Sequence, residues 1–268
     1  MTRPVITLLY VPGDQPGRVA KALASAADVV IVDLEDAVRP DSKAAARDDL
    51  GSLLSEVDRG LQVRINALNT KWIDEDLEAV SALPPGIGVR IPKCEDPLAL
   101  DDLDRRLGSR PLHLLVESAL GVEMAYALSQ CAGVVSIGLG EADLRADLGV
   151  VEDGGMLWAR SRIVNAAAAA GLPAPHMSVY PNVADLDGLR RGCEVGRRLG
   201  FLGRAAIHPR QLPVIAEAFR PSEEDVARAR ELVAAAEISD SGAVLTADGR
   251  FVDEAVLRQA RRTLALAD

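Results

Sequence analysis

The sequence predicts an α/β protein, specifically a TIM-type (β/α)8 barrel with a C-terminal helical extension. Two observations carry this prediction. Eight short apolar runs alternate with helix-like segments between residues 6 and 209, and this is the repeat number that a (β/α)8 barrel requires. The polar, helical tail that follows exceeds what eight βα units need.

The eight apolar runs are the predicted strands. They are rich in Val, Ile and Leu and lack strict alternation of apolar and polar residues, which is typical of parallel strands buried on both faces. In order, they comprise residues 6–11, 29–34, 61–66, 88–92, 112–117, 134–139, 177–181 and 205–209. A doubly wound open sheet shares this alternation, but it usually has fewer strands, and no G-x-G-x-x-G motif follows the first run. The barrel is therefore favoured.

The segments between the runs show the apolar spacing of helices. Clear examples are residues 16–26, 41–56, 119–130, 155–171 and 185–200. Asp41 and Asp185 stand where an N-cap accepts backbone hydrogen bonds. Gly171 and Gly200 stand where a helix C-terminus favours glycine.

The tail, residues 221–268, is predicted to be separate from the barrel domain at 1–220. A helix begins after Ser222, with acidic residues in its first turn. Residues 239–253 are polar and glycine-rich, a turn is expected at 248–249, and a second helix closes the chain. We expect this extension to cap the barrel or to reach a neighbouring subunit.

The composition argues against several classes of protein. The formal net charge is -10 and no basic run occurs, so nucleic-acid binding is not expected. The three cysteines are widely spaced without a C-x-x-C pair, which argues against a disulfide framework or a zinc ribbon. No apolar run approaches the ~20 residues that span a bilayer, and the N-terminus lacks a signal-peptide pattern. We expect a cytoplasmic protein that does not bind membranes.

Charged residues gather at the carboxyl ends of the predicted strands, where barrel enzymes carry their active sites. The set is mostly acidic and comprises Asp14, Asp33, Glu35, Asp36, Arg64, Lys93, Glu95, Glu117, Glu141, Asp143 and His208. Carboxylates suit Mg²⁺, whereas zinc favours His and Cys. Arg64 offers a planar fork for a substrate carboxylate. The pattern indicates a small anionic substrate bound together with Mg²⁺, and an oxyanion or enolate that develops during the reaction.

Seven motifs follow one another in the order YVPGDQP, ADVVIVDLEDAV, VRIN, PKCED, VESALG, GLGEADL and AAIHPRQ. In this order and spacing they resemble the citrate lyase β-subunit-like family of the HpcH/HpaI aldolase superfamily. The resemblance implies a TIM barrel that is usually trimeric. It also implies an enzyme that uses Mg²⁺ to cleave or form a carbon–carbon bond between a CoA thioester and a keto acid.

The resemblance assigns roles around the expected metal. Glu117 of VESALG and Asp143 of GLGEADL match the two metal-ligating carboxylates. Arg64 of VRIN matches the arginine that holds the keto acid carboxylate. The acidic cluster beside the metal, which orients water, substrate or neighbouring side chains, is matched by Asp33, Glu35 and Asp36.

The resemblance also implies a composite site in a homotrimer or a dimer of trimers. Asp253 matches a C-terminal acid/base residue that reaches the site of the adjacent subunit. Arg18 and Arg210 are the expected contacts of the CoA phosphates. The sequence departs from the family pattern at Ala142, where a Glu is common, and at Glu254, where a Pro usually follows the C-terminal Asp. These departures leave the identity of the substrate open.

Simpler roles stay open for single residues. Asp143 and Asp253 precede predicted helices, where Asp is a good N-cap. Arg64 would also serve as the ion-pair partner of Asp33 or Glu35.

The leading functional hypothesis is a lyase or synthase of 3-hydroxyacyl-CoA esters of the malyl-, citramalyl- or citryl-CoA type, which gives acetyl-CoA and a keto acid. Thioester hydrolysis after condensation remains open. The alternatives are a class II pyruvate aldolase that acts without CoA, and a non-catalytic or partner-dependent subunit of a citrate lyase complex.

Overall fold

The computed structural model describes residues 4–108, 110–237, 244–245 and 251–267. The chain divides into two compact units. The larger unit spans Val5–Ala218. The second unit comprises residue 4 together with the described residues from 219 onward. The turn expected at 248–249 lies outside the described residues.

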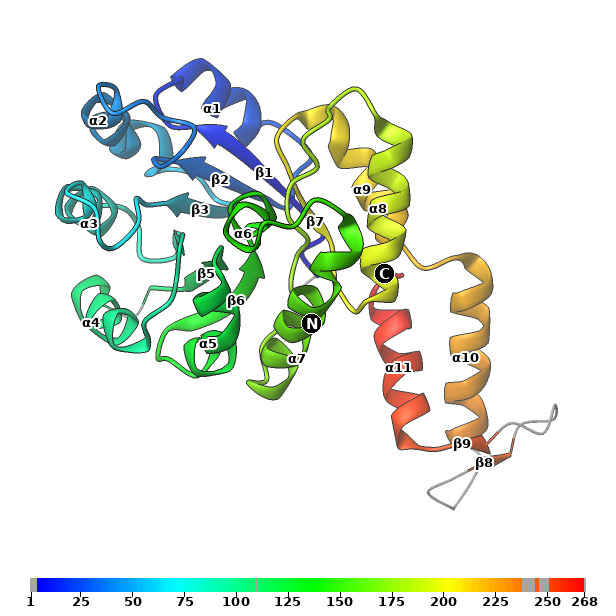
Figure 1. Cartoon of the computed structure of the whole chain (residues 1–268). Coiled ribbons are helices and arrows are strands. Elements are labelled where there is room, and N and C mark those ends of the chain that lie inside the picture. Colours follow the sequence, from blue (N-terminus) through cyan, green and yellow to red (C-terminus); the bar gives the residue numbers. More distant parts are fainter. Residues whose placement is uncertain (1–3, 109, 238–243, 246–250, 268) are drawn as a thin grey trace. The chain divides into compact units, whose positions relative to one another are not determined.

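The larger unit is built on a curled, fully parallel sheet (Figure 1). Its strands are β1 (Thr7–Pro12), β2 (Val29–Asp33), β3 (Gly60–Arg64), β4 (Gly88–Ile91), β5 (Leu112–Val116), β6 (Val134–Leu139) and β7 (Arg204–Ala206). They are ordered β6-β5-β4-β3-β2-β1-β7. The predicted parallel α/β architecture is confirmed, and the carboxyl ends of the strands meet at one edge.

The predicted strand at 177–181 is wrong for the described structure, since it forms only an isolated parallel bridge between Met177 and Arg204. The amide of Met177 donates to Gly203 O at 3.0 Å, and its carbonyl accepts from Ala205 N at 3.0 Å. Pro181 then ends the run without an amide donor. On the other side, Ser178 Oγ accepts from a helix amide instead of joining a ladder with β6. The sheet therefore stays open between β6 and β7.

The last strand is also shorter than the predicted 205–209. β7 ends at Ala206, and a 3-10 helix follows at Pro209–Gln211. His208 caps this turn, because its Nδ1 accepts from the amide of Arg210 at 3.2 Å. His208 thus serves the turn after β7.

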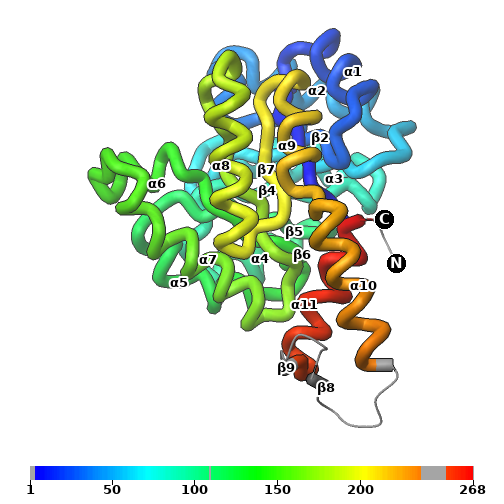
Figure 2. Tube along the Cα trace, turned by 90° about the vertical axis from the view of Figure 1, so that its right-hand side faces the viewer, coloured from blue at the N-terminus to red at the C-terminus, as the bar shows by residue number. Residues whose placement is uncertain are grey.

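Helices cover the outer face of the sheet, and α8 and α9 lie side by side beyond β7 (Figure 2). The helices of this unit are α1 (Pro16–Leu23), α2 (Lys43–Leu54), α3 (Ile73–Ser81), α4 (Pro97–Leu107), α5 (Ala119–Ser129), α6 (Glu141–Leu148), α7 (Leu157–Ala169) and α8 (Leu186–Arg198), and α9 (Leu212–Phe219) reaches the second unit. Asp185 caps α8 as predicted, accepting from Gly188 N at 2.8 Å. The N-cap predicted at Asp41 is wrong, since α2 starts at Lys43 after Ser42.

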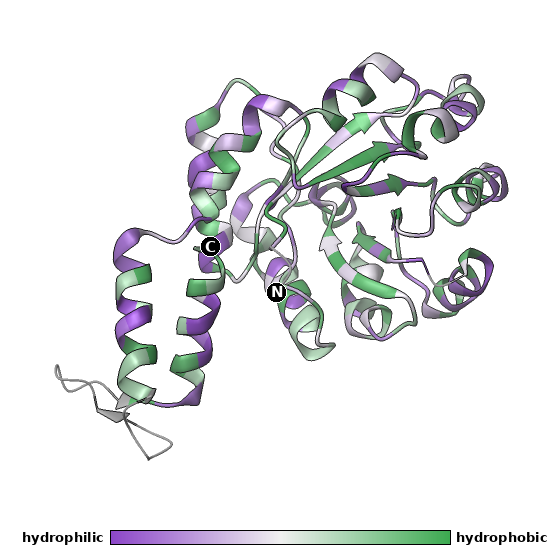
Figure 3. Ribbon diagram, turned by 180° about the vertical axis from the view of Figure 1, so that it is seen from behind, coloured by the Kyte–Doolittle hydropathy of each residue, from purple (hydrophilic) through white to green (hydrophobic). Residues whose placement is uncertain are grey.

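Most residues of the strands are buried, and the strands are mainly hydrophobic while the helices also carry many hydrophilic residues (Figure 3). On the inner face, Leu8, Val29, Ile31 and Ala205 form one buried cluster. The alternate residues, such as Val30, are also buried and pack beneath the helices. This explains why the runs in the sequence lack alternation.

Over its described residues, the second unit contains two long helices and two short paired strands. α10 (Glu223–Glu237) packs against α11 (Glu254–Ala265). β8 (Val244–Leu245) and β9 (Phe251–Val252) pair antiparallel between them. Asp253 is the N-cap of α11, because its Oδ1 accepts from the amides of Ala255 and Val256, each at 3.0 Å. Over the described residues, no helix combines the length and the apolar character that crossing a membrane requires.

Candidate active site

A cavity of about 350 Å³ opens at the carboxyl edge of the sheet and runs into its curl. Its charged lining residues include Asp33, Asp36, Arg64, Glu117 and Asp143. These are five of the residues that the sequence places at strand ends, and they come from four different βα units. The parallel order of the strands brings them together, since all strands end at the same edge.

Arg64 is the hub of the acidic cluster. Asp33 and Arg64 are register partners on β2 and β3, and the guanidinium binds Asp33 through Nε at 2.7 Å and Nη2 at 2.6 Å. Its Nη1 contacts Glu35 at 2.8 Å and Asp36 at 3.2 Å. Burial alone lowers the pKa of Arg64, but the hydrogen bonds and charge of Asp33 outweigh it and raise this pKa. The arginine is therefore a fixed cation.

The turn after β2 is held by Asp33 and by Lys43, and the strand-end pattern of the sequence does not predict the part played by Lys43. Asp33 accepts from the amides of Glu35 at 2.9 Å and Ala37 at 3.1 Å. Lys43, which is buried, donates from Nζ to the carbonyls of Leu34 at 2.6 Å and Glu35 at 2.8 Å. This support fixes where the acids point. A lysine at the start of a helix carries no sequence signal that it reaches back nine residues to a turn.

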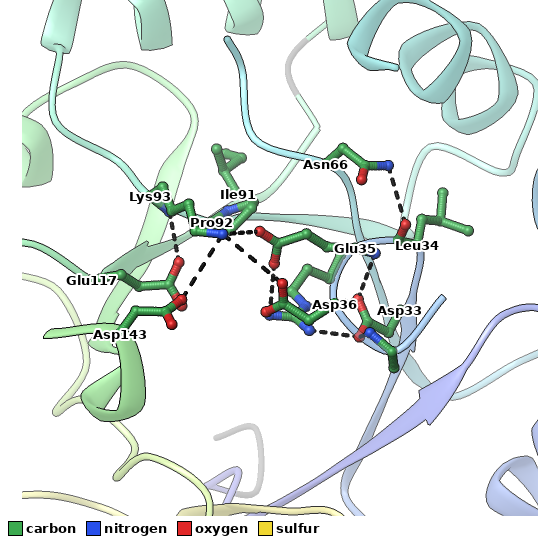
Figure 4. A network of polar contacts seen from close by, with 12 residues as sticks. Asp33, Leu34, Glu35, Asp36, Asn66, Ile91, Pro92, Lys93, Glu117 and Asp143 are labelled. Atoms are coloured by element: carbon green, nitrogen blue, oxygen red, sulfur yellow. Dashed lines mark hydrogen bonds and ion pairs between the residues drawn. The ribbon is translucent and has the colours of Figure 1, made fainter. Parts of the chain in front are cut away.

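Lys93 connects the acidic cluster to the far side of the cavity mouth (Figure 4). Its ammonium contacts Glu35 at 2.7 Å and lies 3.9 Å from Asp143, while its amide donates to Glu117 Oε2 at 3.0 Å. The backbone of Lys93 has φ 53°, a left-handed conformation that few non-glycine residues adopt. Strained backbone conformations occur preferentially at functional sites. Here the conformation lets Lys93 contact Glu35 and Asp143 with its ammonium and Glu117 with its amide.

Glu117 and Asp143 lie side by side across from Glu35 and Asp36 (Figure 4). Burial, together with the like charges of Glu35 and Asp143, raises the pKa of Glu117 to about 8, although Arg64 and Lys93 act in the opposite direction. Burial likewise raises the pKa of Glu35. Glu117 and Glu35 are thus enclosed carboxylates whose charged forms are disfavoured by burial.

This donor set fits a hard divalent cation. No cluster of three or more His, Cys, Asp or Glu side chains with metal-binding geometry occurs in the part of the chain that the structure describes. Mg²⁺ does not require one, because it keeps several waters and takes one or two carboxylates together with substrate oxygens. Glu117 and Asp143 supply that number and lie side by side (Figure 4), and a cation bound between them would offset the cost of enclosing the Glu117 carboxylate.

Other residues predicted at the edge have different tasks. Glu141 does not line this cavity, since both of its oxygens bind the Arg160 guanidinium, at 2.9 and 2.7 Å. Glu95 accepts from Ser118 rather than pairing with Lys93. The remaining predicted residues Asp14, Arg18, His208 and Arg210 do not line it either, and Arg18 and Arg210 are exposed. Asp253 belongs to the second unit.

The cavity also contains polar residues that the strand-end rule missed. Tyr10, Arg90, Ser136 and His176 line it, and they precede the strand ends or lie in the segment that leads to the Met177 bridge. The sequence signal for a polar inner face is the i, i+2 spacing on β3, where Gln62 stands two residues before Arg64; Gln62 accepts from Arg90 Nε on the neighbouring strand.

Comparison with known proteins identifies the family and several relatives of this chain. The family described as HpcH/HpaI aldolase/citrate lyase matches residues 6–209. Citrate lyase subunit beta of Leuconostoc mesenteroides subsp. cremoris is 32% identical, with 98% of this chain and 93% of the relative covered. A (3S)-malyl-CoA thioesterase of Cereibacter sphaeroides is 33% identical, with 99% and 95% covered.

Two solved structures from Mycobacterium tuberculosis superpose on most of this chain. Protein CitE from Mycobacterium tuberculosis, in complex with magnesium, acetoacetate and coenzyme A, superposes with a TM-score of 0.86 at 35% identity and covers 99% of both chains. The citrate lyase beta subunit from M. tuberculosis, complexed with oxaloacetate and magnesium, gives a TM-score of 0.74 at 34% identity, covering 82% of this chain and 99% of the other. With its parallel α/β fold and its acidic cavity, this chain belongs to the HpcH/HpaI aldolase/citrate lyase family.

Proposed function

We propose that this protein is a Mg²⁺-dependent carbon–carbon lyase or synthase that acts on 3-hydroxyacyl-CoA thioesters and yields acetyl-CoA and a keto acid. The observation that carries the proposal is the pair Glu117 and Asp143, which line the cavity side by side and supply the two carboxylates that Mg²⁺ takes from a protein. Relatives that bind magnesium with a keto acid or coenzyme A support it.

Glu117 and Asp143 would hold the ion. An ion bound there would act as a Lewis acid toward the oxygens of the substrate. Arg64 is held by Asp33, Glu35 and Asp36. Because each of its nitrogens already binds one of these acids, it would attract the substrate carboxylate through its positive charge. The ammonium of Lys93 stabilises negative charge at the same mouth.

In the cleavage direction, the hydroxyl of the acyl chain loses a proton and its oxygen becomes the carbonyl oxygen of the keto acid. The carbon–carbon bond breaks, and its electron pair passes to the thioester as an enolate. Protonation of the enolate carbon gives acetyl-CoA. We assign the proton transfer to Asp253 of a neighbouring chain in a trimer, and the contacts of the CoA phosphates to Arg18 and Arg210.

A second part of the proposal concerns the fold, whose parallel sheet is open between β6 and β7. The run 177–181 forms one bridge and no strand, and we propose that it occupies the place that the eighth strand has in a closed TIM barrel. The bridge between Met177 and Arg204 supports this assignment, because it lies next to β7 at the open side of the sheet.

Thioester hydrolysis is a second candidate, since a relative named (3S)-malyl-CoA thioesterase is 33% identical over nearly the whole chain. The two activities differ in products. From malyl-CoA, a lyase releases acetyl-CoA and glyoxylate, whereas a thioesterase releases free CoA and malate.

The test incubates the purified protein and Mg²⁺ with malyl-, citramalyl- and citryl-CoA, and separately with pyruvate and aldehydes, and separates the products by chromatography. We expect a keto acid and acetyl-CoA from at least one CoA ester, and loss of this activity in Glu117→Gln and Asp143→Asn. Asp102→Asn, at an exposed helix position, is the matched control and should retain activity. Turnover with aldehydes alone would assign the chain to the CoA-independent aldolases, and no turnover together with no Mg²⁺-dependent thermal stabilisation would leave a non-catalytic subunit.

A further inference from the structure

The inner face of the sheet is divided into an apolar half and a polar half. β1, β2 and β7 contribute the cluster of Leu8, Val29, Ile31 and Ala205. On the other side, Arg64 is in register with Arg90, Arg90 with His113, and His113 with Ser136 across β3, β4, β5 and β6. The interior of a (β/α)8 barrel is normally filled by branched apolar side chains. A polar row at this level therefore needs an explanation.

Glycines on the polar half leave space beside this row. A Cβ at Gly88 would lie 2.5 Å from His113 Nε2, so the imidazole occupies room that only a glycine provides. Gly138 lines the cavity, and a Cβ there would meet no atom closer than 3.6 Å. The cavity that begins at Glu117 and Asp143 continues down to Arg90, Ser136 and His176. We call this lower part, lined by Arg90, Ser136 and His176, the inner chamber.

Arg90 is the charged residue of the inner chamber, and none of the described residues serves as its counter-ion. It is only 6% exposed, its Nε donates to Gln62 Oε1 at 2.9 Å, and its guanidinium lies 6.0 Å from the Tyr10 ring. Within the described residues, no carboxylate lies at ion-pair distance from it, whereas Arg64 next to it contacts three. An enclosed guanidinium without an anion is costly.

The other titratable groups around the chamber do not compensate this charge. Burial lowers the pKa of His113 to about 3 and that of His176 to about 4, and the charge of Arg90 adds to both shifts. Both imidazoles are therefore neutral near pH 7. His113 bonds Ser136 Oγ at 2.8 Å and His176 bonds the Val5 carbonyl at 2.9 Å, so neither supplies a negative charge. The chamber keeps one net positive charge.

We propose that the inner chamber binds a second carboxylate of the substrate, and that Arg90 thereby selects dicarboxylic keto acids over monocarboxylic ones. This inference rests on the proposed function, since it assumes that the keto acid part enters the cavity at Glu117 and Asp143. The Tyr10 ring lies 5.2 Å from the Arg64 guanidinium and 6.0 Å from that of Arg90, so the two cations are neighbours around one ring. A short diacid would place one carboxylate near Glu117 and Asp143 and the other in the inner chamber beside Arg90.

Arg90 is the better receptor of the two arginines. The donors of Arg64 are already engaged by three acids, while only the Nε of Arg90 has a hydrogen-bond partner in the described structure. Its terminal nitrogens are left for a bidentate pair with a carboxylate. The thioester arm is too long for a cavity of about 350 Å³, so the chamber suits the small keto acid part.

The test compares two four-carbon acids that differ only in the second carboxylate, oxaloacetate and 2-oxobutyrate. Binding of each freshly dissolved acid is measured by calorimetry with and without Mg²⁺. We expect wild type to bind oxaloacetate about tenfold or more tightly than 2-oxobutyrate, since a charge-assisted bidentate pair is added. Arg90→Gln should lose this preference while its affinity for 2-oxobutyrate changes less than about twofold.

Two further variants separate recognition from folding. Arg204→Gln is the matched control: Arg204 is a buried arginine of the same sheet that donates to the Ser178 carbonyl at 3.0 Å and does not line the cavity. It should keep the preference for oxaloacetate. Arg90→Lys, which retains the charge without the fork, should give an intermediate preference and remains informative if Arg90→Gln does not fold.

The outcomes distinguish this inference from the proposed function. Equal affinity for the two acids in wild type, or equal losses for both in Arg90→Gln, overturns the role of Arg90 and leaves the Mg²⁺ site standing. Oxaloacetate binding that depends on Arg90 but not on Mg²⁺ supports the chamber and counts against the proposed function. If neither acid binds under any condition, both the role of Arg90 and the proposed function are refuted.

Discussion

At the residue scale, the site is a balance of enclosed charges. Asp33 and Glu35 are almost fully buried and depend on Arg64, and Glu35 also depends on Lys93. Asp36 contacts the same arginine, but its side chain is 58% exposed. The buried pair of Arg64 with Asp33 should therefore contribute more to stability than the pair of Arg64 with Asp36, because water screens the exposed pair.

Arg64→Met should destabilise the protein by about 3–5 kcal/mol, since it leaves a buried charge without its partner. Asp36→Asn should change the free energy of unfolding by less than about 1 kcal/mol, as expected of an exposed pair. Urea unfolding monitored by circular dichroism measures both. A similar decrease in the free energy of unfolding in both variants would show that burial does not decide how much these ion pairs stabilise the protein.

His113 should make stability depend on pH. Its pKa of about 3 in the folded protein lies below the ordinary value of 6.5, so the neutral imidazole is favoured by folding. This contribution is complete above pH 6.5 and is lost as the pH falls toward 3. At pH 5 the loss amounts to about 2 kcal/mol.

The measurement is the free energy of unfolding between pH 7 and pH 5 for wild type and His113→Gln. We expect the variant to show a shallower decline, with a remaining slope from His176, whose pKa of about 4 is lowered in the same direction. Parallel curves for the two proteins would contradict an enclosed neutral His113.

At the element scale, the junction of β6 and α6 shapes the proposed metal site. Gly140 precedes α6, and a Cβ there would lie 2.5 Å from Glu117 Cγ and closer still to Oε1. The backbone of β6 thus passes against the Glu117 side chain and holds it toward Asp143. This is a close approach that only glycine allows.

Gly140→Ala should displace Glu117 and weaken Mg²⁺ binding by about 10- to 100-fold, the usual range when the support of a ligand is lost. Gly86→Ala is the control, because a Cβ there meets no atom within 4 Å. Calorimetric Mg²⁺ titration of both variants makes the comparison. Unchanged affinity in Gly140→Ala would remove Glu117 from the ligand set.

At the scale of the whole molecule, the role of the second unit depends on Asp253, which caps α11. Asn caps helices about as well as Asp, whereas Ala costs about 1 kcal/mol. Asp253→Asn therefore separates capping from proton transfer. We expect it to keep the melting temperature and to lower turnover of the CoA ester at least about tenfold.

Mixing subunits tests whether the site is shared. Glu117→Gln and Asp253→Asn chains, each impaired alone, should recover part of the activity when unfolded and refolded together, because mixed oligomers contain sites with both native residues. Unchanged turnover in Asp253→Asn would reduce this residue to a helix cap, and no recovery on mixing would argue against a contribution from the neighbouring chain.

The sequence by itself determined the parallel α/β class and the edge at which the acidic residues meet, because alternating apolar runs and helices make every strand point the same way. It also identified Glu117, Asp143 and Arg64 as members of that edge. Only the tertiary structure decided which charges pair. Asp33 and Arg64 are 31 residues apart, and a contact at that separation depends on strand register.

The same reason explains the remaining surprises. The apolar run 177–181 has strand composition, yet its backbone finds a single bridge partner, since pairing depends on the neighbouring strands and not on the run. Arg90 and His113 look like interior positions of ordinary strands in the sequence. In the folded sheet, Arg90 and His113 are register partners and Gly88 lies beside His113. The polar chamber therefore depends on strand pairing, which the sequence does not show.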